Sequence, residues 1–573
     1  MQSWITWAAG GTLTFGCLWA YTYASRRTRE RARRARLRGA WGEAVERGGV
    51  LPNRPLREQA DAGQHEDERL DEQTWSDLLL PEVVERIDRT LTAVGSQTLW
   101  RWIRRPSRSP TSLEQRSALI VELGRDRRLR EQVQEVLLDF GAARGQHLVR
   151  LLWGHIEDPE LPLPLLRAMP WLLLGSMVAG FMLGSLGVLA LGLTIFVANI
   201  VIHNRATHSI APMLLAMEDV GRLVRATGRL ARLPAVADSE AMRPWLEELE
   251  VARAGTEPLI RKTAKLELRD PFDLAEYAKT ILLYEVIRFY RAAALLRRTQ
   301  GRLQRLFDVL GAMDGAQSVA SLHTGESVSV PSFEAPAAAG VPPRIEAEDL
   351  RHPLIDGAVG NSLQLPTSSV LVSGSNMSGK TTFLRTVAVN AVLAQSVLTV
   401  FARRYRGTPV RVSSCINISD DLLGGRSYFR AELDTILALV RRAADGGGLL
   451  VLDEIFRGTN PLERTAAATA VLDHLAANNM VLAATHDLEI GDRVGDAFCE
   501  AHFCEIASEE DDELDFDYRL RPGRIERPNA IALLGRAGFP ELVVQRAMEL
   551  VRTHERPVDE ALGTTVDSVT PAP

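Results

Sequence analysis

The chain has 573 residues, of which 46% are hydrophobic and 24% charged, and its formal net charge is −6. This length suits two to four domains, and the composition of an ordinary globular protein excludes wholesale disorder. The mild acidity excludes a uniformly basic nucleic-acid coat. Four cysteines in so long a chain exclude a disulfide framework, which favours a reducing compartment for the bulk of the protein.

The first predicted element is an N-terminal membrane anchor. Residues 4–24 are uncharged and largely apolar, a length that lets a helix cross the hydrocarbon core of a bilayer. Eight arginines from Arg26 to Arg38 follow, and positive charge placed there retains that side in the cytoplasm. A cleaved signal peptide is the alternative, but it carries its positive charge before the apolar run. We therefore expect an anchor over 1–25 and a basic, then polar, linker over 26–76.

Two helical stretches, 77–167 and 205–330, flank a second apolar segment. Residues 168–204 hold no acidic or basic residue apart from one histidine, with glycines near Gly184 and Gly187, Arg167 before them and Arg205 after them. This pattern predicts a transmembrane hairpin that leaves and returns on the cytoplasmic side. Each arm has only about seventeen residues, so a re-entrant or interfacial hairpin stays open, as does a buried helical pair in a soluble core.

A Pro- and Ala-rich stretch over 331–343 precedes a region with the alternating strands and helices of a parallel sheet. Its β-prone run 369–373 leads into "GSNMSGKT", which matches the phosphate-binding loop pattern, and a helix is expected over 382–394. Lys380 is expected to reach the β and γ phosphates, and the Thr381 hydroxyl to bind Mg²⁺. The predicted nucleotide-binding residues are Gly374, Ser375, Asn376, Met377, Ser378, Gly379, Lys380, Thr381 and Thr382.

The second half of the predicted site follows a buried-strand pattern, "LLVLDE". Asp453 is expected to hold Mg²⁺, and Glu454 to polarise the attacking water as general base. Downstream, "NPLE" from Asn460 is typical of a helix start, with Asn as the cap and Pro in the first turn.

A third strand over 481–484 ends before His486, which brings this side chain to the same sheet edge as a sensor, although a lone histidine is more often structural. Cys499, His502 and Cys504 lie close together in the sequence and raise a metal site as a weak alternative to a plain strand. The residues beyond 553 are polar and predict a disordered tail over 554–573.

Together these motifs resemble the ATPase domain of the MutS family, within the wider class of ABC-type ATPases. The resemblance rests on "SGSNMSGKTTFLRT", "DDLLGGRSYFRAEL", "LLVLDEIFRGTNPLERT" and "AATHDLE", in the family's order, and on helical-core stretches such as "LTAVGSQTLWRWIRRP" and "LFDVLGAMDGAQSVASL". It implies an α/β P-loop ATPase domain over 331–553, with a dimerisation segment near its end, preceded by an all-α core and lever. It also implies ATP and Mg²⁺ as ligands, a homodimer, and a Ser427 that approaches the γ-phosphate bound by the opposite subunit.

The resemblance has two departures. The membrane anchor and linker stand where the family carries its N-terminal mismatch-recognition domain, so we expect no direct mismatch recognition. The hairpin falls inside the helical region, near the family's lever helices.

Our first hypothesis is an ATP-gated dimeric clamp on DNA at the inner face of the cell membrane, in repair or recombination, with Arg-rich helices such as 101–108 contacting DNA or lipid phosphates. The alternative is a membrane-bound ATPase switch that remodels a protein partner; an ABC transporter is a third reading.

Overall fold

The computed structural model describes residues 32, 35, 37–43, 69–141, 147–154, 161–259, 282–335, 340–364, 369–375, 377–416, 428–506, 515–524 and 538–554. The predicted anchor, most of the linker, Asn376, Ser427 and the tail lie outside the described residues. The chain divides into two compact units. The helical unit is Met1–Pro331 with Val392–Val400, and the sheet unit is Ser332–Ala391 with Phe401–Pro573.

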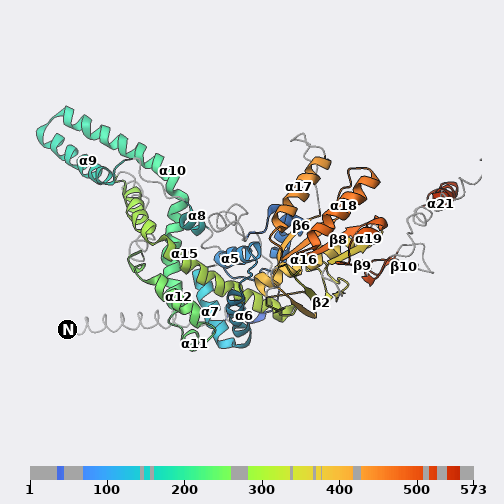
Figure 1. Ribbon diagram of the computed structural model, residues 1–573. Coiled ribbons are helices and arrows are strands. Elements are labelled where there is room, and N and C mark those ends of the chain that lie inside the picture. The colour runs from blue at the N-terminus through green and yellow to red at the C-terminus, as the bar shows by residue number, and fades with distance from the viewer. Residues whose placement is uncertain are drawn as a thin grey trace, which may run out of the picture. The chain divides into compact units, whose positions relative to one another are not determined.

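The helical unit confirms the predicted all-α region (Figure 1). Side-chain caps fix several helix starts: Thr92 accepts from the backbone N–H of Gly95, and Asp126 accepts from that of Leu129. The longest helices described there, α10 and α15, pack against each other and against shorter helices. The helices are α3 (Glu72–Asp77), α4 (Leu80–Ile87), α5 (Ala93–Arg104), α6 (Pro110–Arg125), α7 (Arg127–Phe140), α8 (Leu148–Trp153), α9 (Leu163–Leu183), α10 (Leu186–Leu230), α11 (Pro234–Ala237), α12 (Arg243–Arg253) and α15 (Tyr284–Gly325).

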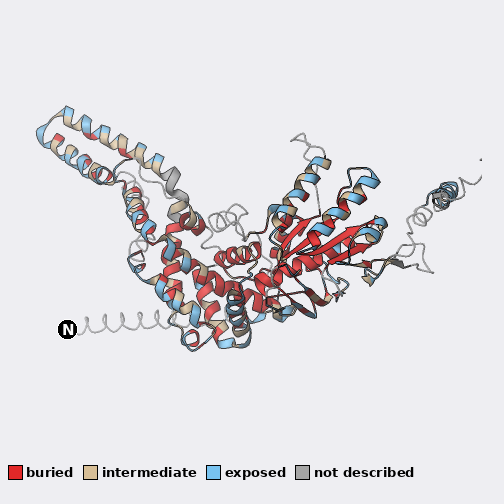
Figure 2. Ribbon diagram, in the orientation of Figure 1, coloured by how far each residue is buried: buried red, intermediate tan, exposed pale blue. Residues whose placement is uncertain are grey.

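Helices α9 and α10 form the predicted apolar hairpin, which turns at Gly184 with a left-handed φ of 60°. By length and composition alone, α9 and the stretch Leu186–Ala206 of α10 are each sufficient to cross a membrane. Their large side chains are exposed, with Phe181 at 85% and Leu186 at 82% (Figure 2). The hairpin is therefore not the buried core pair that the sequence left open.

Helix α10 does not end with the apolar segment. It continues through Arg205 to Leu230, 45 residues in all, which is about 68 Å of helix. Neither glycine nor proline occurs between Leu193 and Ala211, and the helix also continues through Pro212, where one backbone hydrogen bond of the helix is lost. Beyond that point Val220 and Leu223 are fully buried in the helical core. One continuous helix thus joins the exposed hairpin to the core of the helical unit.

Arg101 and Arg104, two of the four arginines in 101–108, correct the hypothesis that this stretch contacts phosphates, whereas Arg108 is exposed. Arg101 is mostly buried and donates to the Asp308 carboxylate. The Arg104 side chain is 3% exposed, donates to Glu72, and lies 4.7 Å from the centre of the Trp75 ring. Both guanidinium groups hold helices together inside the unit, so they are not available to DNA or lipid phosphates.

The sheet unit has a six-stranded sheet in the order β12-β9-β4-β8-β7-β6, in which all neighbours are parallel except β12 and β9. Strands β4, β7 and β8 are buried throughout, as a sheet covered on both faces requires. Its strands are β4 (Ser369–Ser373), β6 (Arg411–Cys415), β7 (Gly448–Asp453), β8 (Met480–Thr485), β9 (Phe498–His502) and β12 (Arg521–Pro522). The helices of the unit are α16 (Lys380–Val397), α17 (Tyr428–Ala443), α18 (Pro461–Ala476), α19 (Leu488–Arg493) and α21 (Glu541–His554).

A second sheet and a short ribbon complete the unit. The four-stranded sheet has the order β1-β5-β2-β3, with strands β1 (Ser332–Phe333), β5 (Arg404–Gly407), β2 (Ile345–Leu350) and β3 (Asn361–Leu363). Strands β10 (Glu505–Ile506) and β11 (Asp515–Phe516) pair with each other. The expected strands at 369–373, 449–453 and 481–484 are confirmed, and the helix expected from 382 begins at Lys380, directly after the phosphate loop.

The last turns of α16 belong to the helical unit, within Val392–Val400. Arg116 of α6 is buried there: it donates to the backbone carbonyl of Ser396, and its guanidinium lies 4.2 Å from the centre of the Trp102 ring. Burial lowers the pKa of Arg116 to about 9. His323 and Thr399 also form a side-chain hydrogen bond of 2.8 Å. These contacts fix the far end of the helix that begins at the phosphate loop.

Candidate nucleotide site

The carboxyl ends of β4, β7 and β8 meet at one edge of the six-stranded sheet. In register, Ser373 of β4 lies opposite Thr485 of β8, and Asp453 of β7 lies opposite Ala484 of β8. The phosphate loop follows β4, Glu454 follows β7, and His486 follows β8. Topology thus gathers residues separated by about a hundred positions in the chain, at the edge where open α/β sheets bind ligands.

Lys380 lies within the curve of the loop, where its Nζ donates to the carbonyl oxygens of Gly374 and Ser375 at 2.8 Å each. Burial lowers the pKa of Lys380, while the charges of Glu454 and Asp453 oppose that change. A glycine is required at 374, because a Cβ there would lie 2.9 Å from the carbonyl oxygen of Phe503. The loop is therefore closed around the ammonium group, which can exchange these carbonyls for phosphate oxygens.

Asp453 and Thr381 form the metal-binding half of the site. The Thr381 hydroxyl donates to Asp453 Oδ2 at 2.5 Å, while Asp453 Oδ1 is buried and has no hydrogen-bond partner. Burial raises the pKa of the Asp453 carboxyl, and the hydrogen bond from Thr381 opposes this rise. A carboxylate oxygen free beside a hydroxyl fits the Mg²⁺ of a P-loop site, which also takes phosphate oxygens and water.

Glu454 is held between two basic side chains. His486 Nε2 contacts its Oε1, and Arg457 donates to its Oε2 at 2.5 Å. Burial alone would raise the pKa of the Glu454 carboxyl, but the hydrogen bond from His486 and the charges of His486, Arg457 and Lys380 hold it below its usual value. Both oxygens are thus engaged and the carboxylate is kept ionised, as a general base must be before it accepts a proton.

The backbone around Glu454 is also unusual. Its φ is 48°, and that of the buried Phe456 is 62°, a conformation that L-residues seldom adopt. The backbone N–H of Arg457 donates to the fully buried Glu432 at 3.2 Å, which ties the segment to α17. This tight turn directs the carboxylate back towards the phosphate loop, a feature that the strand pattern alone did not predict.

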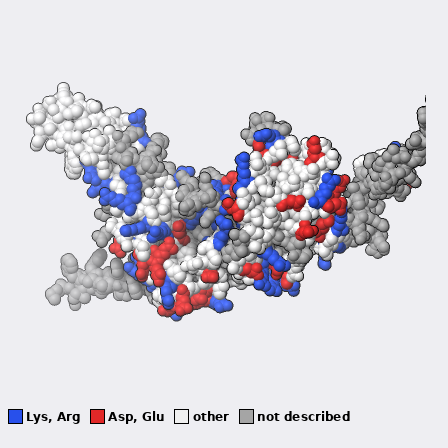
Figure 3. Space-filling view, in the orientation of Figure 1, with Lys and Arg blue, Asp and Glu red and all other residues white. Residues whose placement is uncertain are grey.

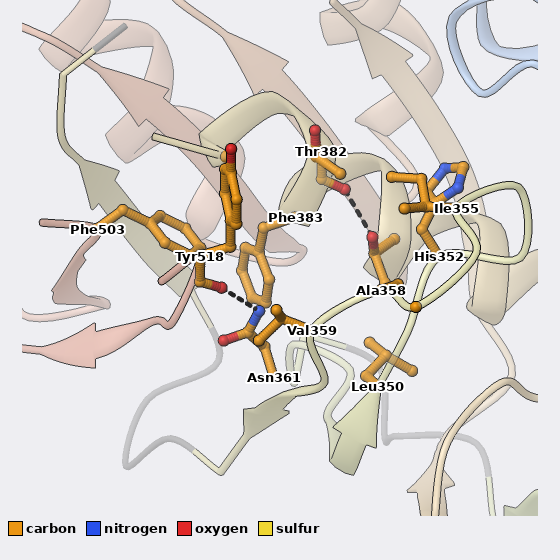
Figure 4. Close-up of a pocket in the computed structure, with 13 residues that line it drawn as sticks. Leu350, His352, Ile355, Ala358, Val359, Asn361, Thr382, Phe383, Phe503 and Tyr518 are labelled. Atoms are coloured by element: carbon orange, nitrogen blue, oxygen red, sulfur yellow. Dashed lines mark hydrogen bonds between the residues drawn. The ribbon is translucent and has the colours of Figure 1, made fainter. Parts of the chain in front are cut away.

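A cavity of about 480 Å³ adjoins the phosphate loop (Figure 4). Tyr518 and Phe383 contribute aromatic rings to its lining, and an ideal Cβ at Gly379 would lie 3.2 Å from the Tyr518 ring. Asn361 donates to the Tyr518 carbonyl at 2.9 Å and accepts from the backbone N–H of Leu520 at 2.7 Å, which fixes the segment that carries the tyrosine.

One of the titratable side chains that line the cavity, a histidine, carries no charge. Burial, together with the charge of Arg385, lowers the pKa of His352 to about 4, so this lining imidazole is neutral at physiological pH. An aromatic, neutral cavity of this size beside a phosphate loop has the properties that a nucleobase requires.

The structure brings together the predicted Gly374, Lys380, Thr381, Asp453, Glu454 and His486, while Asn376 and Ser427 lie outside the described residues. Asn460 caps α18 as expected, accepting from the Glu463 N–H at 2.9 Å. Neither Arg457 nor Tyr518 is predicted from the sequence motifs, although both lie at the site. The cysteine alternative gains no support: the described residues contain no group of three His, Cys, Asp or Glu side chains placed to hold a metal ion.

Known proteins are similar to this chain over the region that holds the site. Residues 370–555 match the family model described as MutS domain V. The DNA mismatch repair protein MutS of Natronomonas pharaonis is 36% identical over 240 residues, which are 39% of this chain and 28% of that protein. MutS 2 of Halobacterium salinarum is 35% identical over 262 residues, 44% of this chain and 29% of the relative. A longer but weaker alignment joins 83% of the chain to 59% of the MutS of Synechococcus sp., at 24% identity.

The chain therefore matches less than a third of the length of the first two of these relatives. What the comparisons support is a MutS-type ATPase domain over residues 370–555, following a helical region. The expected resemblance is confirmed to that extent.

Proposed function

We propose that the chain is a Mg²⁺-dependent ATP hydrolase, and that it uses the hydrolysis cycle to switch its helical unit. The observation that carries this proposal is the convergence of Lys380, Thr381, Asp453, Glu454 and His486 at one sheet edge. Lys380 binds the β and γ phosphates, and Thr381 with Asp453 holds Mg²⁺. Mg²⁺, when bound, neutralises charge that develops on the phosphate oxygens. Glu454 orients the attacking water and takes its proton.

We propose that the cavity beside the loop takes the nucleobase, with Tyr518 stacked on it. Replacing Tyr518 by alanine removes this stacking, which is worth about 1–3 kcal/mol for a base on an aromatic ring. We expect ATP binding to weaken by about tenfold to a hundredfold, while Tyr518→Phe, which keeps the ring, binds as the wild type does. Equilibrium titration with a fluorescent ATP analogue measures both. Unchanged affinity in Tyr518→Ala would place the base elsewhere.

We further propose a homodimer in which Ser427 of one subunit completes the site of the other. A γ-phosphate needs donors on its outer side, and the described residues of one chain supply them mainly from the inner side. Two apolar side chains are exposed in the single chain: Met377, within the phosphate loop, is 85% exposed, and Leu462, at the start of α18, is 70% exposed. A second subunit would cover them.

The physiological role we propose is an ATP-gated dimeric clamp on DNA, in repair or recombination, supported by the likeness to proteins named for DNA mismatch repair. The alternative is a switch that remodels a protein partner without DNA. Its support is the net charge of −6 and the burial of Arg101 and Arg104.

A salt titration separates these two roles. For a DNA clamp, we expect the affinity of the full-length protein for duplex DNA to depend on ATP and to fall steeply as salt rises, because each neutralised phosphate releases counterions. Fluorescence anisotropy with a labelled duplex measures this affinity. Lys380→Ala, which should not bind ATP, serves as the control whose DNA affinity ATP cannot change. Binding that is absent at low salt, with and without ATP, would favour the protein-partner role.

We propose that the hairpin lies in the cell membrane with the sheet unit on the cytoplasmic side. The exposed apolar surface of α9 and α10 supports the first part, and the arginines after residue 24 and beside the hairpin support the second. Protease added to intact cells is therefore expected to spare the sheet unit, and permeabilised cells to lose it. Immunoblotting with an antibody against the sheet unit reports the outcome. Digestion from outside would overturn the topology.

A further inference from the structure

The foot of the apolar hairpin is a basic surface built from three helices. Figure 3 shows the hairpin free of charged atoms and blue Lys and Arg atoms gathered near its foot. No acidic residue occurs between Leu161 and Ala206, and Arg167 and Arg205 stand at the two ends of the apolar segment. Both arginines are exposed. Within 161–206, the acidic and basic side chains other than histidine are therefore these two arginines alone.

The packing of the hairpin shows that Arg167 and Arg205 lie at a similar level. A Cβ at Gly180 would lie 2.8 Å from the Leu189 side chain, so these two positions face each other. Counting back from Gly180 to Arg167, and forward by the same number from Leu189, leads to Ile202, one helical turn before Arg205. The two arginines thus flank the open end of the hairpin.

Helix α15 adds further arginines. It contacts both α9 and α10, and its N-terminal part lies near the foot of the hairpin (Figure 1). Its first twenty residues carry five arginines and one acidic residue, Glu285. Arg291 and Arg298, two turns apart, lie on one face and are exposed. The opposite face carries Phe289 and Leu296, which are buried in the helical core.

Within the described part of the chain, Arg167, Arg205, Arg291 and Arg298 make no ion pair. By contrast, Arg302 farther along α15 donates to the Ala254 carbonyl. The four residues, which we call the arginine collar, are thus exposed guanidinium groups that no acidic side chain among the described residues pairs with. Each offers a planar fork of donors that fits two oxygens of a phosphate.

We infer that the arginine collar binds the phosphates of anionic phospholipids around the hairpin. This inference rests on the proposed membrane insertion. From Arg167 to Gly184 the helix rises about 25 Å, close to the hydrocarbon thickness of about 30 Å. With the apolar arms in hydrocarbon, the collar stands at the level of the lipid headgroups. A duplex DNA would meet the same arginines only by lying against the bilayer surface, so the position of the collar favours lipid.

The collar is tested by the lipid that accompanies the protein. Full-length protein is reconstituted into bilayers of phosphatidylcholine and phosphatidylglycerol in equal amounts, then extracted mildly, and the bound lipids are quantified by mass spectrometry. We expect bound lipid to be enriched in phosphatidylglycerol by about tenfold or more, since each arginine near an anionic surface contributes about a fivefold preference. The enrichment should shrink at high salt, where such charges are screened.

Arg291→Gln with Arg298→Gln removes two charges of the collar and leaves the hairpin sequence intact. We expect the double variant to lose most of the enrichment, while Arg128→Gln, an exposed arginine on α7 away from the hairpin, keeps it. Equal thermal melting of the three proteins shows that they fold alike.

Three outcomes would overturn the inference. In the first, the lipid bound to the wild-type protein has the same composition as the bilayer. In the second, the double variant keeps the enrichment in phosphatidylglycerol. In the third, the double variant loses affinity for duplex DNA while the composition of its bound lipid is unchanged. If the protein fails to enter bilayers of either lipid, the proposed insertion itself is wrong. If the protein inserts into bilayers of pure phosphatidylcholine, the proposed insertion stands whatever happens to the collar, because the apolar arms need no anionic headgroup.

Discussion

Glu454→Gln is expected to lower kcat for ATP hydrolysis by about a hundredfold to ten-thousandfold, the usual contribution of a positioned general base. The amide keeps the size of the side chain and its place between His486 and Arg457, but it cannot take a proton from water. Lys380, Thr381 and Asp453 are untouched, so ATP should bind with near wild-type affinity. Phosphate release under saturating Mg²⁺-ATP and equilibrium binding measure the two quantities separately.

The control for this variant is Glu346→Gln, which removes a partly exposed carboxylate of the same unit that pairs with Arg344, away from the loop. We expect it to turn over ATP as the wild type does. If Glu454→Gln also hydrolyses ATP at the wild-type rate, Glu454 is not the base.

Mixing two variants that are each inactive alone is expected to restore ATP hydrolysis. Lys380→Ala alone should lose nucleotide binding, and Ser427→Ala alone should bind ATP but fail to stabilise the γ-phosphate from the opposite subunit. In a mixed dimer, the intact loop of the Ser427→Ala chain meets the intact Ser427 of the Lys380→Ala chain, and one site is complete. Random pairing makes half of the dimers mixed, each with one working site of two, so about a quarter of wild-type activity should return.

The matched control is a mixture of Lys380→Ala with Glu454→Gln. Lys380 and Glu454 serve the same site from the same chain, where Nζ and the carboxylate flank His486. Their mixture therefore leaves no complete site and should stay inactive. Steady-state ATPase assays after subunit exchange report both mixtures. The shared-site proposal fails if the first mixture recovers nothing, or if ATP leaves the protein monomeric in sedimentation.

The parts of the site that the sequence predicted lie in short motifs whose geometry is local. A buried strand followed by "GSNMSGKT" predicts where Lys380 and Thr381 lie, because the loop and the helix start determine both positions. Parallel pairing then places Asp453 and His486 at the same edge, since the carboxyl ends of parallel strands coincide. Each of these predictions needed only a strand and the residue that ends it.

Other residues were missed because their roles depend on tertiary packing. Tyr518 is more than a hundred residues from the phosphate loop, at the start of the stretch that resembles a dimerisation segment, and its position beside Gly379 depends on tertiary contacts such as those of Asn361. Arg457 had a local signal, three residues after Glu454, but its ion pair depends on the turn that Glu432 stabilises. Arg101 and Arg104 misled for the same reason, because a run of arginines does not show which side chains face inward.

Helix α16 has a consequence for how the protein unfolds. Its first residue, Lys380, belongs to the nucleotide site, while Val392–Val400 belongs to the helical unit, where Val392, Leu393 and Val397 have no exposed surface. Heating cannot melt one unit and leave the other intact without uncovering these side chains or breaking the helix. Unfolding of the helical unit therefore exposes the far end of the same helix whose first residue lies in the phosphate loop.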